Sequence, residues 1–313
     1  MRVRFLVDGF VPSASIEANV RALIDQAVAE IACPAGAVTE LIVTDENRFD
    51  EAVRLLAPGT PRYASDVFTE AGKTITLPST SGRASSGIIL LDHIVVDAFA
   101  ALKLAPEQRS GQAQRCIYVI WHEVAHARDA RLRPPTPRPD RVTDAMGEFK
   151  IRHVANYYRP IVQEEVLVCQ MSAFACTQAM FDLEAREANE VMEAELRELI
   201  GELINYTGDA RHLRRIAFRA AGVFWVCLVQ HGKLLAYQMG NPQLTGGLTL
   251  WASSPTATQG VFQDYASLLK EMVASYPNTA ADFEERLFRI WIQLALIHEY
   301  KFEESPQGDS LSW

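Results

Sequence analysis

Two histidines and a glutamate in the segment His122-Glu123-Val124-Ala125-His126 have the types and the spacing for chemistry on a metal ion. On a helix, residues four apart project from the same face, so the two imidazoles can meet at one ion at about 2.0–2.1 Å. Glu123 lies beside them, placed to take a proton from a metal-bound water. The spacing therefore predicts that His122 and His126 bind a metal ion and that Glu123 is a general base.

The flanking residues favour a helix that can carry such a site. No proline or glycine interrupts Gln112–Ala130, and one side of this helix is apolar: Ile117, Ile120, Trp121, Val124 and Ala125. That side can bury against a sheet and leaves the two histidines and Glu123 on a separate, open side. The alternative interpretation is an amphipathic helix with two solvated histidines. His231 and His298, in apolar helical stretches, are interpreted as structural histidines whose polar atoms are satisfied.

A catalytic zinc ion usually has three protein ligands and a water, so a third ligand must come from elsewhere in the chain. No histidine follows ten residues after His122, where the metzincin pattern has one. Asp129 is better suited to accept a ring N–H from a histidine ligand than to reach the ion. The remaining candidates are three other carboxylates: Asp140, Glu164 and Glu165.

Glu164 and Glu165 begin an apolar helical stretch, where a carboxylate needs a strong partner. We therefore expect one of the two to face the metal ion and its neighbour to face solvent. The alternative is that both simply supply negative charge to the N-terminus of a helix.

These segments together resemble the minimal gluzincin peptidases, most of all the ImmA/IrrE type found in phage and stress-response loci. The resemblance covers residues 100–180 and rests on the His-Glu-x-x-His motif, on Asp129, and on Glu-Glu-Val-Leu-Val-Cys-Gln-Met-Ser-Ala at 164–173. In that family a Glu-Tyr-x-Ala-Cys-Arg-x-x-Ala-like segment supplies the third ligand. Matching Cys169 to its cysteine implies Glu165 as the ligand, with Glu164 as the alternative. This chain differs from the family in having Val166 in place of the aromatic residue and Gln170 in place of the arginine.

The resemblance implies a zinc-dependent hydrolase, a peptidase that uses Glu123 as general base and a zinc-bound water as nucleophile. Its substrate would be a peptide or a protein, held in extended form along an edge strand near Gly87–Leu91. The oxyanion would be stabilised by zinc and by one further donor. The candidates for that donor are His153, Tyr157, Tyr158 and His212.

Periodicity and turn signals predict the elements that position these residues. In the first hundred residues we expect helices over 16–31 and 48–56, strands over 38–44, 73–77 and 87–91, and a turn over 79–86. Helices follow over 107–130, 161–205 (as one or two), 210–239, 259–275 and 280–302, with loops over 131–140 and 240–255 and a frayed tail from 304.

The predicted fold class is therefore α+β. Residues 1–180 are expected to form a zincin-like metallopeptidase domain, made of a helix, a small sheet, the metal-motif helix and the third-ligand helix. Residues 181–313 are expected to form an all-α extension, for which the sequence indicates no role.

Composition sets the remaining expectations. Of the 313 residues, 49% are hydrophobic and 22% charged, which is typical of a folded globular protein. A net charge of −9 makes nucleic acid and anionic lipid unlikely partners. The five cysteines are an odd number and widely spaced, which indicates reduced, packed thiols, with Cys169 and Cys176 on one helix face. Neither a signal peptide nor a membrane-spanning helix is expected, so the predicted location is the cytoplasm.

Two other hypotheses stay open. The chain could be a non-catalytic zinc-binding regulatory or interaction protein with a degenerate peptidase fold. Alternatively, its helical tail could bind nucleic acid around a structural zinc ion. A histidine and carboxylate ligand set argues against the second hypothesis, because structural zinc sites favour cysteine.

Overall fold

The computed structural model describes residues 1–58, 72–77, 84–133, 150–247, 256–303 and 309–312. In this part the chain is a mixed α+β protein, mostly helical, with a small sheet. It divides into two compact units. The sheet unit comprises Met1–Pro135, Val168–Phe181 and Gly240–Leu244, and the helical unit comprises Thr136–Leu167, Asp182–Met239 and Thr245–Trp313. The units alternate along the chain, and the sequential division at residue 180 stays a prediction.

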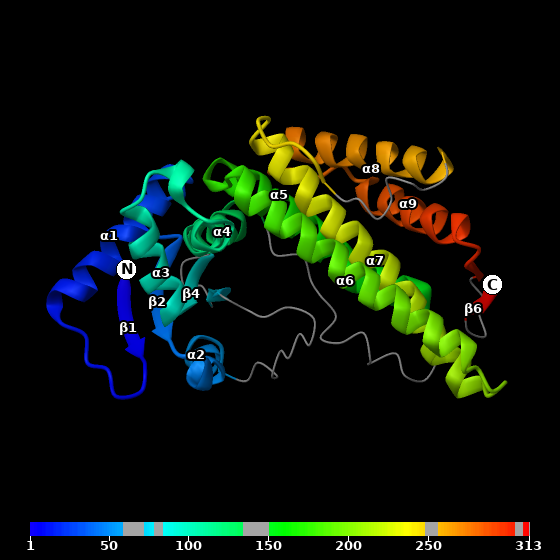
Figure 1. Ribbon diagram of the computed structural model, residues 1–313, viewed down its shortest axis with the longest axis horizontal. Helices are drawn as coiled ribbons and strands as arrows, with labels where there is room; N and C mark the ends of the chain where they lie inside the picture. Colours follow the sequence, from blue (N-terminus) through cyan, green and yellow to red (C-terminus); the bar gives the residue numbers. More distant parts are fainter. Residues whose placement is uncertain (59–71, 78–83, 134–149, 248–255, 304–308, 313) are drawn as a thin grey trace. The chain divides into compact units, whose positions relative to one another are not determined.

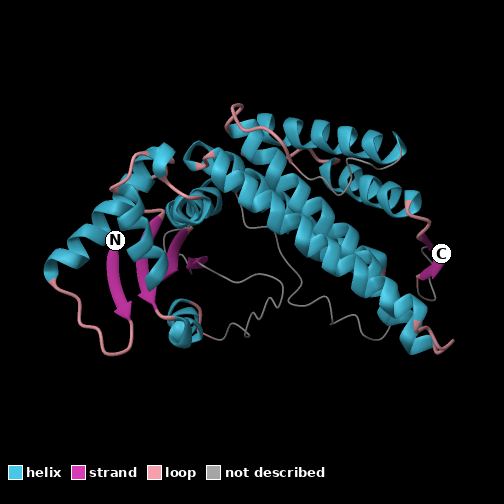
Figure 2. Cartoon of the chain, in the orientation of Figure 1, coloured by secondary structure: helices cyan, strands magenta, loops and turns pink. Residues whose placement is uncertain are grey.

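The sheet of the sheet unit has four strands in the order β1-β2-β4-β3 (Figure 2). Strands β1 (Arg2–Leu6), β2 (Val38–Thr44) and β4 (Ser85–Leu91) are parallel, and β3 (Gly72–Leu77) pairs antiparallel with β4. The prediction that 87–91 is an edge strand is therefore wrong, because β4 pairs with both β2 and β3. Its unbroken apolar run is typical of a strand that is buried on both faces.

Alternate residues of the central strands pack into two hydrophobic cores. Leu41, Val43, Ile88 and Leu90 point to one face, and Ile42 and Ile89 point to the other. The first face packs against α1 (Ala14–Glu30), α3 (Asp92–Leu102) and α4 (Gly111–Leu132), and the second against α2 (Phe49–Leu56). At Gly87 a Cβ would lie 2.6 Å from a methyl group of Leu56, so the Leu56 side chain of α2 packs directly over the backbone of β4 at this glycine.

Two elements of this unit were not predicted from the sequence, namely β1 and α3. In β1 the apolar residues Val3 and Phe5 alternate with Arg2 and Arg4, a strand pattern too short to stand out at the chain's start. The helix α3 begins at Asp92, directly after the last residue of β4, so no loop separates the strand from the helix. Short 3₁₀ turns precede α2 (η1, Glu46–Arg48) and α4 (η2, Pro106–Gln108).

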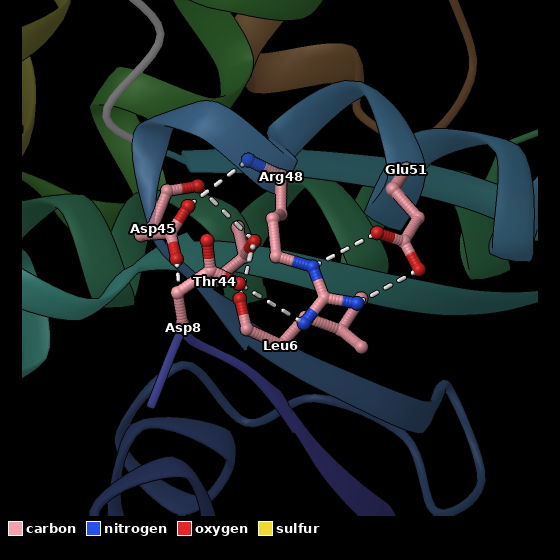
Figure 3. A network of polar contacts seen from close by, with 6 residues as sticks. All are labelled: Leu6, Asp8, Thr44, Asp45, Arg48 and Glu51. Carbon is pink, nitrogen blue, oxygen red and sulfur yellow. Dashed lines mark hydrogen bonds and ion pairs between the residues drawn. The ribbon is translucent and has the colours of Figure 1, made fainter. Parts of the chain in front are cut away.

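A network of polar contacts joins the ends of β1 and β2 to the start of α2 (Figure 3). The Thr44 hydroxyl donates to the Leu6 carbonyl at 3.1 Å, and the Asp45 carboxylate accepts from the backbone amides of Asp8 and Arg48. The Arg48 guanidinium donates two bonds of 2.9 Å to Glu51. These contacts join the C-terminal ends of β1 and β2 to the first turn of α2.

The helical unit is built mainly from five helices of the described residues (Figure 1). They are α5 (Ile151–Ser172, through Leu167), α6 (Gln178–Ile204, from Asp182), α7 (Ala210–Gly240, through Met239), α8 (Thr256–Ser275) and α9 (Phe283–Ile297). Two short strands, β5 (Lys301–Glu303) and β6 (Ser310–Ser312), pair antiparallel near the C-terminus. None of the helices in the described part of the chain is both long enough and apolar enough to cross a membrane.

A column of aromatic rings forms part of the helical unit's core. Tyr158 of α5 stacks on Trp225 of α7 with the ring centroids 6.2 Å apart. Trp225 stacks in turn on Trp291 of α9 at 5.7 Å, and Trp291 stacks on Phe288 at 5.7 Å. Stacking of this kind holds three helices together and fixes the position of α5 within its own unit.

Several helix boundaries differ from those predicted. The helix α5 begins at Ile151, ten residues before the predicted start, and continues through Pro160. It ends at Ser172, and the 3₁₀ turn η4 (Ala173–Ala175) separates it from α6. Cys169 and Cys176 are therefore not on one helix, although four of the cysteines are buried and all five are free, as predicted. The tail is not wholly frayed, because Ser310–Ser312 forms β6 and Leu311 is buried.

Candidate metal centre

The histidine motif lies in the middle of α4, as its spacing predicted. Ser110 caps the helix by accepting a hydrogen bond from the Ala113 amide at 3.1 Å, so the helix begins a few residues later than expected. The predicted apolar side (Ile117, Ile120, Trp121, Val124 and Ala125) is buried in the core of the sheet unit. The Trp121 indole also donates to Glu30 of α1 at 2.7 Å, which fixes the rotation of α4 about its own axis.

His122 and His126 direct the same ring nitrogen at one another. Their Nε2 atoms are 3.1 Å apart, and their rings meet edge to face with centroids at 4.7 Å. Glu165 of α5 adds a carboxylate oxygen, and the three ligand atoms all lie within 4.8 Å of one another. All three side chains are partly exposed. This group could hold a metal ion, and of the two predicted glutamates it contains Glu165.

The chemistry of this donor set fits a divalent metal ion. Two nitrogens bound to one tetrahedral zinc ion at 2.0–2.1 Å lie about 3.3 Å apart, close to the distance seen between the Nε2 atoms. A cation beside the two imidazoles would accept one ring-nitrogen lone pair from each, and the Glu165 carboxylate would supply negative charge to it.

Strand β3 holds the side chain of Glu123. The Thr74 hydroxyl lies 2.7 Å from Glu123 Oε2 and 2.8 Å from the Glu123 carbonyl oxygen. At Gly72, two residues earlier on the same face of β3, a Cβ would lie 3.0 Å from Glu123 Cγ. The prediction that Glu123 lies on an open side of the helix is wrong, because Glu123 is only 6% exposed and its side chain is enclosed between β3 and α4. Neither Thr74 nor Gly72 was predicted, because β3 is remote from the motif in sequence.

His122 has a polar partner on the side away from His126. The Tyr118 hydroxyl lies 3.1 Å from His122 Nδ1, and the Ser172 hydroxyl of α5 lies 3.0 Å from that of Tyr118. Neither residue was predicted. Tyr118 could have been found from the sequence, because it precedes His122 by four residues and therefore projects from the same helix face.

Asp129 is buried and engaged by Arg133. Its two carboxylate oxygens accept hydrogen bonds of 3.0 and 2.5 Å from the Arg133 guanidinium. This pair holds the last turn of α4. The predicted role of Asp129, to orient a histidine ligand, stays a prediction, and Asp140 lies outside the described residues.

The predicted transition-state donors lie on α5 and α7. His153 is exposed and His212 is partly exposed. Tyr158 is packed in the aromatic column of the helical unit, where burial raises the pKa of its hydroxyl to about 12, and Tyr157 meets it edge to face. Tyr158 precedes Glu165 by seven residues, which is two turns, or about 10 Å along the helix. Their role as donors stays a prediction.

Comparisons of this chain with known proteins identify no relative. No protein-family model, no curated protein and no solved structure matches this chain. The functional argument therefore rests on the geometry of the side chains around α4.

Proposed function

We propose that this protein is a zinc-dependent hydrolase, and that it cleaves peptide bonds. The observation that carries the proposal is the convergence of one ring nitrogen each of His122 and His126 and a carboxylate oxygen of Glu165 within 4.8 Å. Two imidazoles and one carboxylate form the ligand set of catalytic zinc sites, which keep a further position for water, whereas structural sites are closed and rich in cysteine. The proposal includes the resemblance to gluzincins of the ImmA/IrrE type and a zincin-like fold for the sheet unit.

Zinc bound by these three residues would supply Lewis acidity, which activates water and polarises a carbonyl group. Glu123 is the general base that accepts the proton of the attacking water. Its carboxylate is well placed for that role, because the Thr74 hydroxyl holds Oε2 and the absence of a side chain at Gly72 leaves room for Cγ. A base that is held in one position loses little orientational freedom when the water is deprotonated.

The substrate proposed for this centre is a peptide in extended conformation. Strand β3 is the last strand of the sheet as described, and it packs along α4. A peptide that pairs with its outer edge would lie about 5 Å from β3. Because Thr74 of β3 contacts Glu123, such a peptide would pass beside the general base. This assigns to β3 the substrate-binding role that sequence analysis gave to 87–91.

The proposal is tested first on the metal and then on cleavage. The purified chain is expected to bind one zinc ion, measured by elemental analysis after dialysis against metal-free buffer. The zinc-loaded chain is then incubated with a library of natural peptides, and new termini are identified by mass spectrometry. Glu123→Gln is the matched variant, because it keeps the size and the Thr74 contact while removing the base. We expect it to retain zinc and to slow cleavage by a factor of about 10² to 10⁴.

Two results would count against the proposal. A chain that binds no zinc would contradict the metal centre itself. A chain that binds zinc but yields the same termini with and without Glu123→Gln would contradict the hydrolase and favour a zinc-binding regulatory or interaction protein.

A further inference from the structure

The helix α4 carries a polar stripe of residues spaced four apart, namely Gln114, Tyr118, His122 and His126. Residues at this spacing project from the same face of a helix. His122 and His126 belong to the candidate metal group. Tyr118 and Gln114 precede His122 by one and two turns, so the metal centre lies at one end of a longer polar stripe.

The end of α5 and the turn η4 contact this stripe in the reverse order. Gln114 Nε2 donates to the carbonyl oxygen of Ala175 at 2.5 Å, and the Ser172 hydroxyl donates to the Tyr118 hydroxyl at 3.0 Å. Both contacts lie inside the sheet unit. Two turns before Ser172, Glu165 adds its carboxylate to the group that contains the two histidines. As the position on α4 advances along the chain, its partner on η4 and α5 runs back, which is the order of an antiparallel helix pair.

Gln114 is held at both ends of its amide. It is buried, and its Oε1 accepts a hydrogen bond of 3.1 Å from Arg109. Arg109 also donates to the carbonyl oxygens of Ala101 and Leu104 at the end of α3. An arginine only donates and a carbonyl only accepts, so these partners fix which atom of the amide is the oxygen and which is the nitrogen. Gln114 therefore connects the end of α3 to the last carbonyl of η4.

These contacts determine the register of α5 along α4. A slip of one residue moves a helix by 1.5 Å along its axis and rotates its side chains by about 100°. Such a slip would direct the Glu165 carboxylate away from the two histidines, whose ligand atoms now lie within 4.8 Å of it. Gln114 and Ser172 are both buried, so water does not compete for the two hydrogen bonds that oppose the slip.

We propose that Gln114 is a positioning residue that sets the register of α5 on α4 and thereby holds the Glu165 carboxylate beside the two histidines. Ser172, through Tyr118, is a second and weaker contact of the same kind. The inference rests on the proposed function, since it concerns a ligand of the same metal centre. It extends that function because it assigns the placement of the third ligand to a residue about 12 Å from His122 along α4.

The experiment measures zinc affinity, by competition with a chromogenic chelator at constant pH. Gln114→Glu keeps the size of the side chain and the bond from Arg109, but a carboxylate oxygen replaces the N–H that donates to Ala175. We expect zinc binding to weaken by about tenfold, as is usual when a group that supports a metal ligand is removed. Ser172→Ala removes one bond between neutral groups and should weaken zinc binding by about threefold.

Gln238→Glu is the matched control. Gln238 lies on α7, and its Nε2 also donates to a backbone carbonyl, that of Gly246, at 2.9 Å. The same substitution therefore removes the same kind of hydrogen bond elsewhere in the chain. It should leave zinc affinity unchanged, and circular dichroism verifies that each variant is folded.

A double-mutant cycle with Glu165 separates positioning from a merely structural role. Glu165→Gln is expected to weaken zinc binding by about tenfold or more in the original chain. If Gln114 acts by placing Glu165, the same substitution should weaken binding by about twofold or less in Gln114→Glu, because the carboxylate is already displaced from the ion. If Gln114→Glu weakens binding only because the chain is less stable, the two losses multiply. Where Gln114→Glu does not fold, the same cycle with Ser172→Ala decides.

The outcomes distinguish this inference from the proposed function. If the original chain binds zinc and both Gln114→Glu and Ser172→Ala bind it equally well, the positioning role is overturned while the metal centre stands. Losses that multiply in the cycle with Glu165 also overturn it. If the original chain binds no zinc, the metal centre itself fails, and the positioning role fails with it.

Discussion

Two histidines, His122 on α4 and His231 on α7, both lie in apolar helices but have opposite surroundings. His122 contacts the Tyr118 hydroxyl through Nδ1 and faces His126 through Nε2. His231 packs against the rings of Phe262 and Tyr265, at centroid distances of 4.3 and 6.2 Å. Its Nδ1 is buried without a hydrogen-bond partner in the described part of the chain. Desolvation lowers the pKa of His231 to about 4.

The comparison shows what turns a histidine in a core into part of a site. Desolvation alone produces a neutral ring that fills space, as at His231. A candidate metal ligand also needs a polar neighbour at each ring nitrogen. One neighbour orients the ring by a hydrogen bond, and the other is a second ligand that can bind the same ion. The interpretation of His231 as structural agrees with its packing, but the prediction that its polar atoms are satisfied is wrong, because Nδ1 has no hydrogen-bond partner in the described residues. Its buried Nδ1 shows that a core can hold an unpaired ring nitrogen at the expense of stability.

The largest expected difference is between a variant of the histidine pair on α4 and a variant of His231, with zinc affinity as the measurement. His126→Ala should weaken zinc binding by more than about a hundredfold, since the free energy of zinc binding is shared among a few ligands. His231→Leu should leave zinc affinity unchanged. Equal losses in the two variants, measured by chelator competition, would mean that His126 is no ligand.

The two neighbouring glutamates provide the next test. Glu165→Gln should weaken zinc binding strongly, by about tenfold or more, because a neutral amide oxygen replaces a charged ligand. Glu164→Gln is the matched control and should have little effect, as Glu164 is outside the ligand group. A loss confined to Glu164→Gln would reverse the assignment of the third ligand.

Support of the general base is expected to matter less than the ligands. Thr74→Val keeps the shape of the side chain but removes the hydroxyl that contacts Glu123 Oε2. We expect cleavage to slow by about tenfold, the equivalent of one hydrogen bond to a charged group, with zinc affinity unchanged. Thr74→Ser should restore the rate. Thr76→Val, at the exposed position two residues along β3, is the control and should cleave at the original rate.

The smallest effect concerns acid stability and His231. Its pKa is about 4 in the folded chain and about 6.5 when unfolded, so between these values the unfolded chain binds the extra proton. The free energy of unfolding is therefore unaffected by His231 above pH 6.5. It falls as the pH drops towards 4, by no more than about 3 kcal/mol, because the proton binds the unfolded chain more tightly. Urea unfolding of His231→Leu should show a shallower loss between pH 7 and 5 than the original chain. Parallel curves would contradict the lowered pKa.

Local patterns in the sequence predicted those features that depend on a single element. The helix over the motif, its buried side and the facing of His122 and His126 follow from a period of 3.6 residues, and these predictions are confirmed. Strands β2, β3 and β4 were predicted close to their bounds. The start of α5 was missed, because the helix was predicted to begin at Ile161, whereas it begins at Ile151 and continues through Pro160.

What the sequence alone determined is therefore the facing pair of histidines and the glutamate beside them, since their spacing along one helix fixes their geometry. The order of the strands, the edge position of β3 and the contacts of Thr74, Gly72 and Ser172 were decided by the tertiary structure alone. These residues are far from the motif along the chain, and no local period records which strand pairs with which or which hydroxyl meets a given ring. That Glu165 and not Glu164 joins the two histidines in one group was also decided by the tertiary structure, because neighbours on a helix point in directions about 100° apart and only packing selects one of them.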